Sequence, residues 1–148
     1  MLYSYDVFDT LIWRTVPRAK DIFRLMETNE HFGRIWEGRW GSFAQLRVWA
    51  EKHVRSNRFS ETAIEKIYAE LQRRVSCSDE CVRELMLLEL LTDKKYTILN
   101  PEIVGEIRRH IDSGERVVLI TDMYWHERQI RELLMEKDAV FSGIPIYV

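Results

Sequence analysis

The sequence predicts an α/β fold, in which a parallel sheet of about three strands is interrupted by an all-helical insertion. Short apolar runs rich in β-branched or aromatic residues occur at 2–8, 116–121 and 144–148, and such runs are typical of buried strands. Between the first run and the second, apolar residues recur at helical spacing over about 80 residues. Strands separated by helices favour a parallel sheet, because parallel strands need long crossover connections.

The predicted core is formed by two segments, one before and one after the insertion in the sequence. We expect 1–16 and 99–148 to form the core and 17–98 to form the insertion. The insertion directly follows the first expected strand, which is where a lid or cap over a site at the sheet edge would be placed.

In the core, two helices and the strand between them follow from local signals. Asn100 and Pro101 are expected to begin a helix, since asparagine caps helices and proline suits the first helical turn, and Gly114 is expected to end it. The run 116–121 contains no polar alternation, as expected for a strand covered on both faces. A second amphipathic helix is predicted over 126–136.

Apolar stripes and capping residues predict helices throughout the insertion. They cover about 17–28, 42–56, 61–74 and 79–92, and Ser60 is the expected cap of the third. The fourth is apolar around much of its circumference, so we expect it to be buried between the others. Residues 29–41 carry three glycines and show no period, which predicts a loop.

The composition restricts the classes of function. Apolar residues make up 46% of the chain, and 22 basic against 24 acidic residues leave a net charge of −2. A nucleic-acid partner is not expected, because polyanion binders carry a basic excess. The start of the chain lacks a signal-peptide pattern and no stretch approaches the ~18 apolar residues of a membrane span, so we expect no membrane partner and a cytoplasmic location. Cys77 and Cys81 are interpreted as two ordinary thiols of a reducing compartment.

Candidate site residues follow the ends of two expected strands. Asp6 ends the apolar part of the first strand and Thr10 follows four residues later, while the second strand ends in Thr121 and Asp122. The carboxyl ends of parallel strands meet at one edge of a sheet, where open α/β folds bind ligands. An aspartate there can act as a nucleophile in phosphoryl transfer, with hydroxyl groups and backbone amides binding the phosphate oxygens. The alternative is that the aspartates only cap a turn.

Two motifs resemble those of the haloacid dehalogenase (HAD) superfamily. The segment Asp6-Val7-Phe8-Asp9-Thr10-Leu11 resembles motif I, and Ile120-Thr121-Asp122-Met123-Tyr124 resembles motif II. More narrowly, the chain is similar to the HAD-like hydrolases often found near polysaccharide-synthesis and glycosyltransferase functions. The segments that carry this narrower resemblance are 8–11 with Arg14, 46–51, 100–102, 121–124 and 129–134.

The resemblance implies a fold, a reaction and a metal ion. It implies a HAD-like Rossmannoid parallel sheet with an α-helical cap inserted after motif I, and hydrolysis of a small phosphorylated metabolite. Asp6 would be the nucleophile and a ligand of Mg²⁺, with the backbone carbonyl of Phe8 as a second metal ligand. Thr10 would donate a hydrogen bond at the site, and Thr121 would hold a phosphate oxygen.

Two departures from the family pattern leave the activity open. Family phosphatases usually carry a second aspartate, the general acid/base, at the position of Phe8, and loss of such a group typically costs a factor of about 10²–10⁴. The motif III lysine and the motif IV acidic pair normally follow the third strand, where this chain stops at Val148. The resemblance therefore predicts the N-terminal part of a HAD domain, truncated or excised. Two alternatives remain: a catalytically inactive or partner-dependent interaction module, and a 2-haloacid dehalogenase, whose halide leaving group needs no proton.

Further side chains are predicted to bind a substrate. Arg14 and Arg47 are candidates for contacting a phosphate or carboxylate, and Asp122 for the rim of the site. The alternative for Arg47 is a surface ion pair with Glu51, four residues later on a helix.

Two other regions are predicted to meet a ligand or a second chain. Trp36, Trp40 and Trp49 either stack on a sugar or base or pack the small helical insertion. In the HAD fold the motif IV strand pairs beside the motif I strand, so 2–8 is expected at a free edge, which predicts self-association through this strand.

Overall fold

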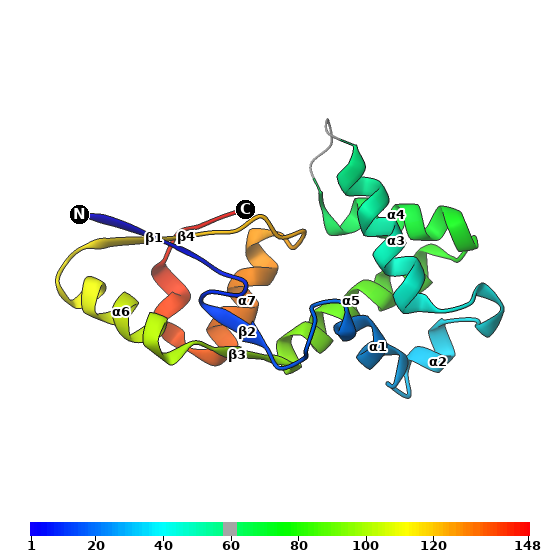
Figure 1. Cartoon of the computed structure of the whole chain (residues 1–148), viewed down its shortest axis with the longest axis horizontal. Helices are drawn as coiled ribbons and strands as arrows, with labels where there is room; N and C mark the ends of the chain where they lie inside the picture. Colours follow the sequence, from blue (N-terminus) through cyan, green and yellow to red (C-terminus); the bar gives the residue numbers. More distant parts are fainter. Residues whose placement is uncertain (58–61) are drawn as a thin grey trace. The chain divides into compact units, whose positions relative to one another are not determined.

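The computed structural model describes residues 1–57 and 62–148 and divides the chain into two compact units. The sheet unit comprises Met1–Thr15 with Thr97–Val148, and the helical unit comprises Val16–Tyr96 (Figure 1). These boundaries fall next to those expected from the sequence. No helix in the described residues is long and apolar enough to cross a membrane.

The sheet unit is built on a three-stranded parallel sheet, so the expected α/β class is confirmed. The strands lie in the order β1 (Leu2–Asp6), β4 (Arg116–Ile120) and β5 (Ile146–Tyr147). β4 is in the middle, and β1 pairs with no strand on its other side among the described residues. β1 is therefore an edge strand.

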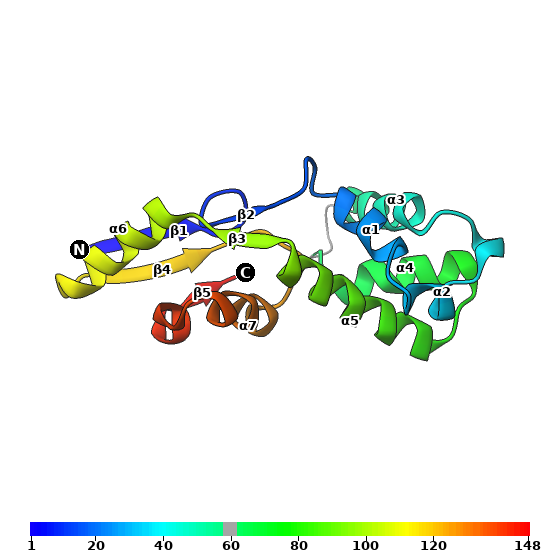
Figure 2. The same ribbon diagram turned by 90° about the horizontal axis from the view of Figure 1, so that it is seen from below.

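Both helices of the sheet unit, α6 (Pro101–Asp112) and α7 (Glu127–Lys137), lie on one side of the sheet (Figures 1 and 2). The crossovers from β1 to β4 and from β4 to β5 progress in the same direction, and right-handed crossovers then place their helices on the same face. Val117 and Leu119 of β4 are buried, whereas Ile120 is 49% exposed. The prediction that this strand is covered on both faces is therefore wrong, since its side chains alternate between a covered and an open face.

The sequence does not predict the two-stranded antiparallel pair formed by β2 (Ile12–Arg14) and β3 (Thr97–Leu99). Three-residue strands are too short to show an alternating period. The pair joins the two points where the chain leaves and re-enters the sheet unit. A short 3₁₀ helix, η2 (Ala139–Gly143), connects α7 to β5.

The start of α6 confirms the predicted asparagine cap. The Asn100 side chain accepts a hydrogen bond from the backbone N–H of Glu102 at 3.1 Å. Asn100 also joins α6 to the turn after β1, because its side-chain amide donates to the Thr10 carbonyl at 3.1 Å and its backbone N–H to the Leu11 carbonyl at 2.8 Å. Gly114 adopts φ +70°, a conformation that ends the helix at little cost for glycine.

The helical unit contains α1 (Asp21–Glu27), α2 (Phe32–Ile35), the 3₁₀ helix η1 (Gly38–Trp40), α3 (Phe43–Ser56), α4 (Ile64–Val75) and α5 (Asp79–Lys95). Ser42 and Ser78 cap α3 and α5, since their side chains accept hydrogen bonds from the backbone N–H groups of Gln45 and Cys81. The predicted cap Ser60 lies outside the described residues.

Residues 29–41 do not form the predicted loop, because they contain α2 and η1. The Phe32 and Trp36 rings pack edge-on against Phe43, with centroid distances of 5.3 and 5.2 Å. This packing outweighs the local effect of three glycines on the backbone.

The expectation that α5 is buried all round is also wrong. Leu87 and Leu91 are 58% and 50% exposed, while Glu89 and Asp93 are completely buried. The helix exposes leucines and buries carboxylates because the interior of the helical unit contains Arg47, which supplies the opposite charge for Glu89.

Candidate functional site

The carboxyl ends of β1 and β4 lie side by side at one edge of the sheet. Asp6 is opposite Ile120 in the parallel register, so Thr121 directly follows the residue that faces Asp6. Both strands point toward the same edge because they are parallel. This edge therefore brings together two predicted site residues that are far apart in the sequence.

A tight turn after β1 positions the side chains that follow Asp6. The backbone N–H groups of Leu11 and Ile12 both donate to the Val7 carbonyl, at 3.0 and 2.9 Å, and the N–H of Asp9 donates to the Ile12 carbonyl at 2.9 Å. Asp9 adopts φ +62°, which aspartate tolerates better than most residues. Val7 and Leu11 are fully buried and anchor the turn.

Within this turn the hydroxyl of Thr10 donates to Asp6 Oδ2 at 3.0 Å. The bond holds the carboxylate in one orientation and leaves the second carboxylate oxygen for another partner. Asp6 is exposed at the strand end. The turn therefore brings Asp6 and Thr10, four residues apart in the sequence, into direct contact.

Thr121 is buried and links two strands at the same edge. Its backbone N–H donates to the Tyr147 carbonyl at 2.9 Å, and its hydroxyl oxygen accepts from the N–H of Met123 at 3.3 Å. A hydroxyl that accepts in this way keeps its own proton for donation. The side chain of the next residue, Asp122, is exposed on the turn after β4.

Phe8 and Arg14 contact each other in the sheet unit. Phe8 is buried and pairs with Ile12 across the turn, and the Arg14 guanidinium lies over the Phe8 ring, 4.8 Å from its centroid. A cation held over an aromatic face is stabilised by the ring quadrupole. The sequence identifies both residues but gives no signal for this contact.

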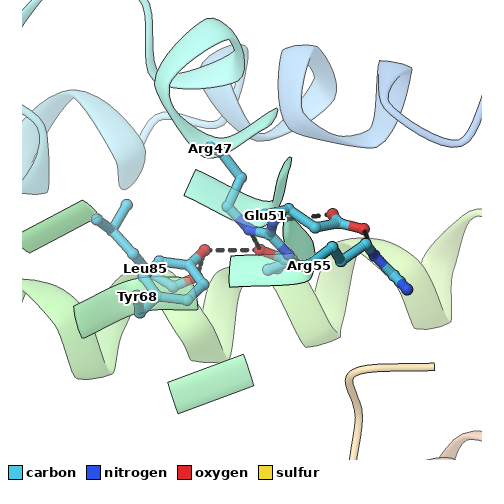
Figure 3. A network of polar contacts seen from close by, with 6 residues as sticks. Arg47, Glu51, Arg55, Tyr68 and Leu85 are labelled. Carbon is cyan, nitrogen blue, oxygen red and sulfur yellow. Dashed lines mark hydrogen bonds and ion pairs between the residues drawn. The ribbon is translucent and has the colours of Figure 1, made fainter. Parts of the chain in front are cut away.

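Arg47 occupies the interior of the helical unit (Figure 3). Its Nε and one terminal nitrogen donate to the two carboxylate oxygens of Glu89, both at 2.8 Å, and the other terminal nitrogen donates to Glu51 at 3.1 Å. The pair with Glu51 exists, but the prediction that it lies on the surface is wrong, because Arg47 is completely buried. Arg47, a predicted substrate-binding residue, thus forms a bidentate pair inside the unit.

The partners of Arg47 include residues that the sequence analysis does not identify. The Tyr68 hydroxyl donates to Glu89 Oε2 at 2.7 Å, and the Arg47 guanidinium lies 4.6 Å from the Phe23 ring centroid. One signal could have identified Glu89: it stands four residues after Leu85 on the buried stripe of α5, where an isolated carboxylate needs a buried cation.

The other titratable candidates form no further site. Burial raises the pKa of the Cys81 thiol to about 12, so it stays protonated at neutral pH. Burial also lowers the pKa of Lys137, whose ammonium donates to the Thr97 carbonyl at 2.6 Å. In the described part of the chain, no three His, Cys, Asp or Glu side chains come together as a metal-binding group.

The edge of the sheet thus combines an oriented carboxylate at Asp6 with hydroxyl groups at Thr10 and Thr121. Such an arrangement can place a nucleophilic oxygen next to donors for an anionic group. Neither a scan against models of protein families nor a search of the curated proteins finds a match for this chain. The resemblance to the HAD superfamily therefore depends on the two motifs and the segments around them.

Proposed function

We propose that the sheet unit carries the nucleophile of a HAD-like phosphohydrolase that acts on a small phosphorylated metabolite. The observation that supports it most directly is the hydrogen bond of Thr10 to Asp6 at an exposed strand end beside Thr121. One carboxylate oxygen is held and the other is available, which is the state that a nucleophilic aspartate needs.

In the proposed reaction, the available oxygen of Asp6 attacks phosphorus and the bond to the leaving oxygen breaks. This forms an aspartyl phosphate, and the leaving oxygen takes up a proton from water. A water molecule then attacks the same phosphorus, releasing phosphate and the Asp6 carboxylate while its proton passes to solvent. The hydroxyl of Thr121 donates to a phosphate oxygen, together with turn amides other than those of Asp9, Leu11 and Ile12, which bond within the turn.

In this proposal the Asp6 carboxylate and the Phe8 carbonyl would hold a Mg²⁺ ion. Magnesium sites often use one or two carboxylates and complete their octahedron with water and substrate phosphate. Two protein oxygens are therefore compatible with a magnesium ion, whose chemistry would be to neutralise charge on the phosphate.

Phe8 predicts a particular substrate dependence. An apolar ring cannot protonate the leaving oxygen, so the rate depends on how well that oxygen departs as an anion. We expect an aryl phosphate, whose leaving group is stable as an anion, to react much faster than an alkyl phosphate.

The alternative function is an inactive or partner-dependent HAD-like interaction module, and Phe8 is the observation that favours it. A 2-haloacid dehalogenase is the third candidate, because a halide leaves without a proton. These candidates differ in what Asp6 does. It reacts in the phosphatase and the dehalogenase but not in the interaction module.

The test compares the wild-type chain with Asp6→Asn, each with Mg²⁺ and with the metal chelated. We expect aryl phosphate hydrolysis that requires both Asp6 and Mg²⁺, with Asp112→Asn as a control at an exposed position of α6. Equal, near-zero rates for wild type and Asp6→Asn would favour the interaction module. Chloride release from a 2-haloacid without phosphatase activity would favour the dehalogenase.

The free edge of β1 supports a second proposal, self-association through this strand. Its unpaired backbone groups can pair with another chain, and Leu2 is 54% exposed beside them. Light scattering at rising concentration should detect dimers, and Leu2→Lys should shift them toward monomer. Ile98→Lys is the matched control, since Ile98 is similarly exposed at 49% on β3. A monomer at every concentration contradicts the proposal.

A further inference from the structure

A pocket of about 320 Å³ opens on the surface of the helical unit. The residues that line it include Trp40, Trp49, Arg74, Gln45 and Leu46. The pocket is formed by η1, the first turns of α3 and the last turn of α4. All of its residues belong to one compact unit, so the pocket is independent of Asp6.

The three tryptophans of the helical unit differ in their exposure and hydrogen bonding. Trp36 is 8% exposed, and its indole N–H donates to the Gly41 carbonyl at 2.8 Å. Trp49 is 39% exposed and Trp40 is half-buried. Across residues 1–57 and 62–148, no hydrogen bond uses the indole N–H of Trp40 or Trp49. All three take part in packing, since the Trp40 ring packs edge-on against Trp36 with centroids 4.9 Å apart and the Trp49 ring stacks on His53 at 5.4 Å. Trp40 and Trp49 also line the pocket.

Among the described residues, Arg74 has no counter-ion. Its guanidinium lies 5.6 Å from the centroid of the Trp49 ring, and it forms no ion pair or hydrogen bond with any described residue. The adjacent Arg73, in contrast, pairs with Glu70. A guanidinium held beside an aromatic ring with its donors unused is suited to bind a phosphate or carboxylate in bidentate fashion.

We propose that this pocket binds a small ring-shaped ligand that carries an anionic group. Indole walls favour a flat ring with apolar faces, such as a pyranose or a nucleobase. Gln45 offers both a donor and an acceptor for ring substituents, and Arg74 binds the anionic group. The volume is at the lower end of small-molecule sites, which are roughly 300–1,000 Å³, and so suits a monosaccharide phosphate or a mononucleotide.

The test is a titration of the full chain with ¹⁵N-labelled tryptophan, observed through the indole N–H signals. The probes are glucose 6-phosphate and AMP, with glucose and inorganic phosphate as probes of the separate parts. The Asp6→Asn variant is titrated alongside wild type, so that hydrolysis at the sheet unit cannot consume a probe. We expect saturable shifts of the Trp40 and Trp49 signals with at least one ring phosphate, and none for Trp13, which lies in the sheet unit.

Two variants in α4 distinguish the effect of the Arg74 charge in the pocket from the effect of lowering the net positive charge of the helix. Arg74→Gln should weaken binding at least about tenfold, which corresponds to 1.4 kcal/mol. Arg73→Gln removes an arginine next to it that already has a partner, and should leave binding unchanged. An unshifted Trp36 signal in each variant reports that the unit is still folded.

Sugar phosphate and nucleotide are distinguished by which probe saturates at the lower concentration. Glucose alone binding as tightly as glucose 6-phosphate would overturn the role of Arg74. An equal loss of affinity in Arg73→Gln would do the same. Absence of saturable shifts with both ring phosphates at millimolar concentration would overturn the proposal as a whole, whether or not Asp6 proves catalytic.

Discussion

The two units of this chain each contain a hydrogen-bonded carboxylate, but the two carboxylates differ in burial. In the sheet unit, Asp6 lies exposed at a strand end, with one hydrogen bond from Thr10. In the helical unit, Glu89 is fully buried and accepts two hydrogen bonds from Arg47 and one from Tyr68 (Figure 3). An exposed carboxylate with a free oxygen can bind or react with a ligand. A buried carboxylate whose two oxygens both accept hydrogen bonds acts in the stability of the fold instead.

The largest expected effect on stability comes from removing the buried carboxylate, Glu89. Glu89→Ala removes the bidentate partner of Arg47 and leaves a buried cation without its main counter-ion, so the helical unit should lose about 3–5 kcal/mol of unfolding free energy. Urea denaturation followed by the fluorescence of Trp36, Trp40 and Trp49 measures it.

Glu51→Ala is the matched control, because Glu51 contacts the same arginine from a side chain that is 23% exposed. Its loss should cost about 1 kcal/mol or less. Equal losses for the two variants would mean that burial does not distinguish the two carboxylates.

A smaller effect on stability is expected from Asn100, which links α6 to the turn after β1. Asn100→Ala removes the cap of α6 and the side-chain bond to the Thr10 carbonyl, which should cost about 1–2 kcal/mol in the unfolding of the sheet unit. Denaturation followed by circular dichroism, or by the fluorescence of Trp13 and Trp125, measures it. Ser113→Ala, at the exposed end of the same helix, should have little effect, and a comparable loss there would contradict the role assigned to Asn100.

The smallest effect concerns a half-buried pair of the sheet unit, His110 and Glu115. A hydrogen bond from His110 is the main cause that lowers the pKa of Glu115, with 2.6 Å between His110 Nδ1 and Glu115 Oε2. A carboxylate whose pKa is depressed in the folded state stabilises the fold above its unfolded pKa of about 4.3, and this contribution is lost as the pH falls below that value.

We therefore expect the urea midpoint to fall slightly more on acidification for wild type than for Glu115→Gln. The comparison runs from neutral pH to about pH 3, below the ordinary pKa of a glutamate. An identical decline in both proteins would show that the pair contributes nothing.

Much of the local structure could be predicted from the sequence. The positions of β1 and β4, the asparagine cap of α6 and the start of α3 near residue 42 follow from short-range signals, because strand composition and capping act over a few residues. Asp6 and Thr10 are both predicted as site residues, and the hydrogen-bonded turn after β1 brings their side chains into contact.

Other features could not be predicted, because they depend on contacts between distant segments. β2 and β3 are three residues each and exist through their mutual pairing. The α2 segment is helical because aromatic rings pack around it, despite the glycines near it. The open face of β4 results from the order of the strands, which puts both crossover helices on the other face.

The sequence by itself predicted that Asp6 and Thr121 lie at the ends of two strands of an α/β sheet, and it offered a pair of Arg47 with Glu51 on one helix as one of two alternatives. Only the tertiary structure decided which of these charged side chains is exposed and which is buried. The reason is that helical spacing fixes which side chains are adjacent, whereas burial depends on what packs over them. Glu89 and Tyr68 enclose Arg47 from other helices, and the described residues leave Asp6 exposed at the sheet edge.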